Sequence, residues 1–118
     1  MQLDPAPYYG DVAHGPDGGT AFWLTTSDKK RLRVGLWPCA DARGTVLIFP
    51  GRTEFVEKYG QTVARLASHG LTSMAIDWRG QGLSDRLLGD PMVGHVERFS
   101  DYQKDVDAML RAARALKL

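Results

Sequence analysis

Two short apolar runs constrain the fold of this chain, because each leads into a glycine-bearing loop. Residues 45–49 (TVLIF) precede Pro50 and Gly51, and the run 71–77 (LTSMAID) precedes the loop that contains Gly80 and Gly82. A short, continuous apolar run is typical of a strand buried on both faces of a parallel sheet. Loops that leave the carboxyl ends of such strands form the rim where ligands bind in open α/β sheets.

The segment between the two runs has a helical pattern. Its apolar residues recur at helical spacing, at Phe55, Tyr59, Val63, Leu66 and Ala67. Gly70 suits the position that follows a helix. The order strand, helix, strand therefore predicts a right-handed parallel crossover.

A second helix is predicted at the end of the chain, after a long connection over residues 86–97. Ser100 and Gln103 fit a capping box, which marks the start of a helix. An apolar stripe follows at Phe99, Tyr102, Val106, Met109, Leu110 and Ala113.

The chain before the first apolar run predicts an antiparallel hairpin. Residues 20–26 and 31–37 are strand candidates, and residues 27–30 between them are turn-like. Residues 1–19 are rich in Pro, Gly and Asp and predict an irregular arm. We therefore expect an α/β fold over residues 20–118, with the antiparallel hairpin followed by parallel β-α-β-α units.

Composition excludes several classes of function. The chain has 118 residues, which is one domain at most, and a formal net charge of +1 that gives no reason to expect nucleic acid. A single cysteine, Cys39, rules out an intramolecular disulfide framework and a cysteine-based metal cluster. No histidine pair has metal-ligand spacing, so neither metal nor cofactor is expected. Because residues 1–10 lack the features of a secretory signal and no run could span a bilayer, we expect a cytoplasmic location, or a peripheral one at a membrane.

Several spaced motifs resemble an established enzyme fold. Residues 50–54 (PGRTE), residues 58–59 (KY) and residues 77–84 (DWRGQGLS) are similar to the N-terminal half of an α/β-hydrolase of the lysophospholipase and monoacylglycerol-lipase branch. The weaker motif at 99–102 (FSDY) agrees, and the resemblance runs from about residue 20 onward. It implies a serine hydrolase that cleaves lipid-like or other small esters through an acyl-enzyme.

The resemblance implies a role for the first loop. In this family that loop supplies one backbone N–H of the oxyanion hole, which assigns the donor to the main chain of Arg52. Such a donor stabilises the oxyanion by roughly 2.7–4 kcal/mol. Gly51 lets the backbone turn close to substrate without a Cβ. Pro50 stands where many relatives have His, which leaves the argument for Arg52 intact.

Gly51, Thr53 and Glu54 are candidate substrate-binding residues beside Arg52. Arg52 and Glu54 could also contact a phosphate or polar head group, since arginine binds phosphate through a fork of donors. A helix that starts at Thr53 and Glu54 explains the same residues without a ligand, and we favour that interpretation.

The second loop is interpreted as a structural rim. Its polar and glycine residues, Asp77, Arg79, Gly80, Gly82 and Ser84, would join the loop together by hydrogen bonds. The two glycines also resemble part of a dinucleotide fingerprint, but Asp85 stands at its third glycine position. We favour the structural interpretation over a direct catalytic or nucleotide-binding role.

The nucleophile that the family uses is not found in this sequence. It is a serine in a G-x-S-x-G turn after the fifth strand, and the acid and histidine follow it. Ser84 comes closest, but Arg86 stands where the second glycine should be. We therefore expect a chain truncated before this turn, with the oxyanion loop present and the triad absent, and inactive by itself.

A second function class remains open. The chain could be a non-catalytic fragment that acts by association with a complementary segment or partner. The strand at residues 45–49 should expose an apolar sheet edge, and such edges favour self-association.

Overall fold

The computed structural model describes residues 4–13, 15–51, 54–84 and 101–118. Their strands form one five-stranded sheet in the order β1-β2-β3-β5-β4. The strands are β1 (Asp4–Ala6), β2 (Thr20–Thr25), β3 (Arg31–Trp37), β4 (Gly44–Ile48) and β5 (Leu71–Ile76). The helices are α1 (Gly10–Ala13), the 3₁₀ helix η1 (Val56–Tyr59), α2 (Gly60–Ser68) and α3 (Asp101–Ala115).

The sheet confirms the predicted fold class. Strands β2 and β3 form the expected antiparallel hairpin, in which Phe22 lies opposite Val34. Strands β4 and β5 run parallel with α2 between them, and Leu47 lies opposite Met74. The hairpin joins the parallel pair through antiparallel pairing of β3 with β5. An antiparallel hairpin that leads into a parallel crossover is therefore observed as expected.

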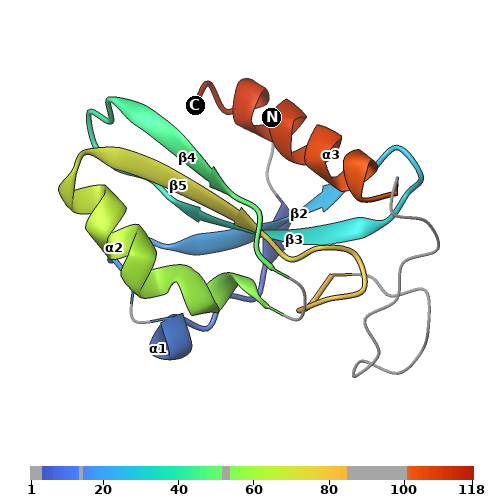
Figure 1. The fold of residues 1–118 in the computed structure, drawn as a ribbon, viewed down its shortest axis with the longest axis horizontal. Helices are drawn as coiled ribbons and strands as arrows, with labels where there is room; N and C mark the ends of the chain where they lie inside the picture. Colours follow the sequence, from blue (N-terminus) through green and yellow to red (C-terminus); the bar gives the residue numbers. More distant parts are fainter. Residues whose placement is uncertain (1–3, 14, 52–53, 85–100) are drawn as a thin grey trace.

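Each face of the sheet is covered by a different helix. Helix α3 packs on one face, and η1 and α2 pack on the other (Figure 1). The core under α3 consists of Phe22, Leu24, Leu32, Val34, Met74, Ile76, Ala108, Met109, Ala112 and Ala113. The smaller core under α2 consists of Trp37, Val56, Val63 and Ala75. Because side chains alternate along a strand, odd-numbered residues of β3 face η1 and α2.

Residues 4–13 differ from the irregular arm expected from composition. Strand β1 adds to the sheet antiparallel to β2, with Pro5 opposite Phe22. Helix α1 then packs against Gly60, where a Cβ would come within 1.9 Å of the Ala13 carbonyl oxygen. The glycine therefore permits a backbone-to-backbone contact that no local pattern in the arm reveals.

The predicted helix pattern was wrong at Phe55. This residue precedes η1 in an extended conformation, with φ of −142° and ψ of 163°, and its side chain is exposed. The regular α-helix begins only at Gly60, and Gly70 follows it with the expected positive φ of 77°.

Helix α3 is confirmed, but its buried face is rotated from the predicted stripe. Asp105, Ala108 and Ala112 are buried with Met109 and Ala113, whereas Tyr102, Val106 and Leu110 are half-buried. Asp105, Ala108 and Ala112 were not counted in the apolar stripe, and Arg79, the partner of Asp105, lies 26 residues away in sequence. Phe99 and Ser100, and with Ser100 the predicted capping box, lie outside the described residues.

Candidate active-site rim

The two loops identified from sequence lie side by side at one edge of the sheet. Strands β4 and β5 are parallel neighbours, so their carboxyl ends meet there. The Trp78 indole Nε1 donates a hydrogen bond of 2.7 Å to the Pro50 carbonyl oxygen. The Phe49 and Trp78 rings are 5.6 Å apart, and Trp78 also contacts the ring of Tyr102 at 5.1 Å. The first loop is therefore fixed to the second and to α3.

Glu54 is hydrogen-bonded to the start of the first loop. Its Oε1 accepts hydrogen bonds from the Gly51 N–H at 2.6 Å and from the Tyr59 hydroxyl at 2.7 Å. Its Oε2 lies 2.5 Å from Lys58 Nζ. The Lys58 contact, with Tyr59 and the Gly51 N–H, lowers the pKa of Glu54 to about 2. Arg52 and Thr53 lie outside the described residues.

A buried arginine beneath the rim, Arg33, was not singled out from sequence. Its side chain is 1% exposed and faces η1. The guanidinium Nη1 and Nη2 donate to the two carboxylate oxygens of Glu57, each at 2.6 Å. Nη1 also donates to the Pro7 carbonyl at 2.9 Å, and Nε donates to Asp77 at 2.7 Å. Burial alone would raise the pKa of Glu57, but Arg33 holds it below its usual value.

Asp77 organises the start of the second loop. Besides Arg33, its carboxylate accepts the N–H groups of Val56 at 2.8 Å and of Leu83 at 2.9 Å. Burial raises the pKa of Asp77, against the opposing effect of Arg33 and these N–H donors. Gly82 lies so close that a Cβ there would be 2.2 Å from an Asp77 oxygen. Asp77 therefore joins the end of β5, the start of η1 and its own loop.

Ser84 has the contacts of a structural residue. Its hydroxyl donates a hydrogen bond to the main-chain carbonyl of Asp77 at 2.6 Å and accepts one from the main-chain N–H of Arg33 at 2.8 Å. The residue is buried, with 3% of its surface exposed. A nucleophilic hydroxyl needs access to substrate and a neighbouring base. His69, the one histidine in the described ranges, instead caps α2 at its C-terminus.

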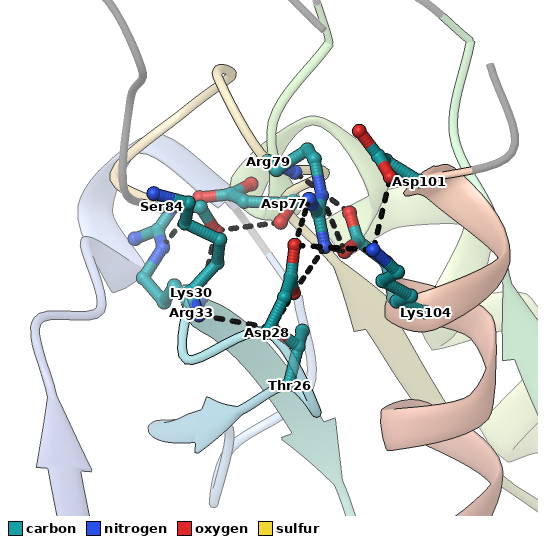
Figure 2. A network of polar contacts seen from close by, with 10 residues as sticks. Thr26, Asp28, Lys30, Arg33, Asp77, Arg79, Ser84, Asp101 and Lys104 are labelled. Carbon is teal, nitrogen blue, oxygen red and sulfur yellow. Dashed lines mark hydrogen bonds and ion pairs between the residues drawn. The ribbon is translucent and has the colours of Figure 1, made fainter. Parts of the chain in front are cut away.

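A second buried arginine, Arg79, joins the second loop to α3 and to the hairpin. Its backbone N–H and Nε donate to the Asp105 carboxylate at 3.0 and 2.9 Å. Its Nη1 and Nη2 donate to Asp28, in the turn between β2 and β3, at 2.7 and 2.9 Å. Figure 2 shows Lys104 of α3 approaching the same Asp28, at 3.7 Å. Hydrogen bonding to Arg79 holds the pKa of Asp28 well below its usual range, whereas burial raises the pKa of Asp105.

The rim is thus supported by two buried arginines and their carboxylate partners. Among the described residues, no group of three His, Cys, Asp or Glu could hold a metal ion. None of the described helices is long and apolar enough to cross a membrane.

Comparison with known proteins identifies the family. Residues 40–117 match the family model described as "Serine aminopeptidase, S33", which lies in the α/β-hydrolases. Over 63 residues the chain is 49% identical to lysophospholipase L2 of Escherichia coli, a match that covers 53% of this chain and 18% of that protein. The matched segment is therefore a small part of the relative's length.

Solved structures support the same fold. An esterase from Pyrococcus furiosus matches 96% of this chain with a TM-score of 0.65 at 14% identity, over 41% of its own length. The haloalkane dehalogenase DatA from Agrobacterium tumefaciens matches 91% of the chain with a TM-score of 0.62 at 19% identity, over 32% of its own length. At such identities the likeness concerns the fold alone.

Proposed function

Because the chain belongs to the serine aminopeptidase S33 family of α/β-hydrolases, we propose that it forms the oxyanion side of a carboxylic-ester hydrolase. The proposed substrates are lysophospholipids, monoacylglycerols or related small esters. The observation that carries this proposal is the hydrogen bond from the Gly51 N–H to the Glu54 carboxylate, at the carboxyl edge of the β4–β5 pair. The 49% identity to a lysophospholipase over 63 residues favours this ester class.

The proposed chemistry is acyl transfer to a nucleophile, followed by hydrolysis of the acyl-enzyme. Attack on an ester carbonyl creates an oxyanion, and a fixed backbone N–H stabilises it. We assign that donor to the Arg52 main chain and propose substrate contacts at Gly51 and Thr53. The nucleophile, acid and histidine would come from outside residues 1–118, because Ser84 is buried in structural hydrogen bonds.

Glu54 acts on the turn rather than on the substrate in this proposal. Its carboxylate already accepts the Gly51 N–H and the Tyr59 hydroxyl and pairs with Lys58. These contacts support a positioning role. Asp77, Arg79, Gly80, Gly82 and Ser84 are proposed as the structural rim that holds the turn in place.

A chimera tests this function. Residues 40–117, which match the family model, would replace the segment of E. coli lysophospholipase L2 that aligns to the same model, and hydrolysis of a lysophospholipid would be measured. We expect the chimera to retain turnover, because the grafted segment supplies an equivalent oxyanion turn. A chimera that is folded by circular dichroism but inactive would contradict the proposal.

Two variants of the chimera separate positioning from general damage. Glu54→Gln should lower kcat more than it changes KM, because the oxyanion exists only in the transition state and its intermediate. Asp107→Asn neutralises an exposed carboxylate on α3 and should leave both constants unchanged. If Glu54→Gln and Asp107→Asn have the same kcat and KM, Glu54 has no positioning role.

Association with a complementary segment is a second candidate function. Strand β4 is the last strand of the sheet and, within the described part of the chain, pairs with β5 alone. All its residues are half-buried, so an added strand would find apolar contacts there. A partner of this kind, or a second copy of the chain, could pair with this edge. A cytoplasmic or peripheral membrane location remains a prediction.

A further inference from the structure

Several of the large exposed apolar side chains of the described residues gather at one place. The large ones are Tyr9, Phe49, Phe55, Leu83 and Leu118. Three of the five, Tyr9, Phe55 and Leu83, line a single cavity of about 310 Å³. They come from the N-terminal arm, the start of η1 and the loop after β5. Convergence of separate segments on one apolar hollow is typical of a small-molecule site.

The Tyr9 wall of this cavity is held in place. The Tyr9 N–H donates to Glu57 at 3.0 Å, and the Pro7 carbonyl accepts from Arg33 at 2.9 Å. Both partners are buried, and helix α1 is docked close to Gly60. The arm therefore contributes a fixed wall.

The floor of the cavity is charged but fully paired. Arg33 and Glu57 line it, with side chains 1% and 3% exposed. Each guanidinium nitrogen already donates to a protein oxygen, and both Glu57 oxygens already accept. An anionic ligand would have to break one of these buried bonds, which is strongly unfavourable. The lining therefore favours an uncharged, apolar occupant.

We propose that the cavity between Tyr9, Phe55 and Leu83 binds a medium-length alkyl chain. The volume of about 310 Å³ lies at the lower end of the range for small-molecule pockets, which suits a single unbranched chain better than a bulky ligand. Phe55 directly follows Glu54 of the fixed turn, and Leu83 belongs to the rim loop. Assigning the alkyl chain to an ester substrate rests on the proposed function, whereas the binding site itself does not.

Titration of the ¹⁵N-labelled chain with 1-octanol tests the site, because this probe is uncharged and cannot be hydrolysed. We expect saturable shifts of the Tyr9, Phe55 and Leu83 amide signals. Leu83→Gln should weaken octanol binding roughly tenfold, the scale of one lost aliphatic contact. Leu118→Gln is the matched control, because Leu118 is 43% exposed and Leu83 is 41% exposed. Phe55→Gln is the second variant, should Leu83→Gln fail to fold by circular dichroism.

Each outcome decides the proposal. Binding that is weakened by Leu83→Gln or Phe55→Gln but not by Leu118→Gln supports it. Equal effects of the Leu83 and Leu118 variants, or unshifted Tyr9 and Phe55 signals, would overturn it. If inorganic phosphate shifts the same amide signals, the site binds anions, and the proposal of an apolar ligand is wrong. If the chain binds octanol but the chimera is inactive, the alkyl-binding site is supported and the proposed function is not. If the chimera is active but the chain does not bind octanol, the proposed function is supported and the alkyl-binding site is not.

Discussion

Arg79 contacts Asp105 through both its main chain and its side chain. The backbone N–H and Nε donate to the two carboxylate oxygens at 3.0 and 2.9 Å, and both residues are buried. This pair connects the loop after β5 to α3 across 26 residues of sequence. The rim and the helix that covers the main core therefore depend on one buried carboxylate.

Removing that carboxylate should strongly destabilise the fold. Asp105→Ala leaves the buried Arg79 with Asp28 as its one charged partner among the described residues, so we expect the free energy of unfolding to fall by about 3 kcal/mol. Urea denaturation measures the change. Asp107→Ala, at an exposed position on the same helix, should change stability by less than about 0.5 kcal/mol. Similar changes in the free energy of unfolding for the two variants would show that the buried Arg79–Asp105 pair does not contribute more to stability than an exposed carboxylate.

Ser84→Ala should act on stability rather than reveal a nucleophile. The change leaves the Arg33 N–H and the Asp77 carbonyl without their buried partner, which costs about 1–3 kcal/mol. Ser68→Ala removes an exposed hydroxyl that also donates to a main-chain carbonyl, and should cost much less. Labelling of Ser84 by a fluorophosphonate probe, detected by mass spectrometry, would contradict its structural assignment.

Gly82→Ala should disrupt the Asp77 cluster. Gly82 has φ of 53°, and a Cβ there would lie 2.2 Å from an Asp77 oxygen. Gly18→Ala separates backbone strain from steric collision, because Gly18 has φ of 85° but no atom of the described residues lies within 4 Å of its Cβ position. Conformation alone should cost about 1–2 kcal/mol at either site. Thermal unfolding should show a clearly larger loss of stability for Gly82→Ala than for Gly18→Ala. Equal losses would show that a Cβ at position 82 does not collide with Asp77.

The Glu54 turn should weaken only in acid. Its pKa in the folded chain is about 2, below the usual 4.5, so its stabilising effect is present above pH 4.5 and is lost as pH falls toward 2. The stability difference between the chain and Glu54→Gln should therefore be constant near neutrality and shrink over that acid range. A ¹³C titration of the Glu54 carboxyl group measures the midpoint directly. A midpoint near 4.5 would mean that the turn is not held in solution.

The β4 edge should cause self-association. Sedimentation velocity at increasing concentration should show oligomers, and Val46→Lys should reduce them because lysine on an edge strand opposes pairing. Thr62→Lys adds the same charge on exposed α2 and is the control. A chain that stays monomeric at every concentration and unfolds cooperatively would argue against self-association through the β4 edge.

The main elements of the fold were predictable because each has a local signal. The alternating pattern of residues 31–37 and the apolar runs before Pro50 and Asp77 gave the hairpin and the parallel pair. The short elements in residues 4–13 had no such signal, because β1 depends on pairing with β2, and α1 depends on its contact with Gly60. Phe55 fitted the helical spacing but lies before the helix.

The rim loops were also predictable, but the charges beneath them were not. Their glycines and polar residues mark the positions where two strands end at one edge. The burial of Arg33 and Asp105 depends on carboxylates or donors distant in sequence, and a charged residue is ordinarily expected at the surface. Glu57, the main partner of Arg33, had no sequence pattern that would pair it with this strand.

The partners of the two arginines have a consequence for how the chain folds. Arg33 bonds Glu57, Pro7 and Asp77 at sequence separations of 24, 26 and 44 residues, and Arg79 bonds Asp28 at 51. Long loops must close before such contacts can form, so the rim should consolidate late, after the local β2–β3 hairpin. A nascent or arrested chain would then hold its hairpin while the rim at the carboxyl ends of β4 and β5 was still unformed.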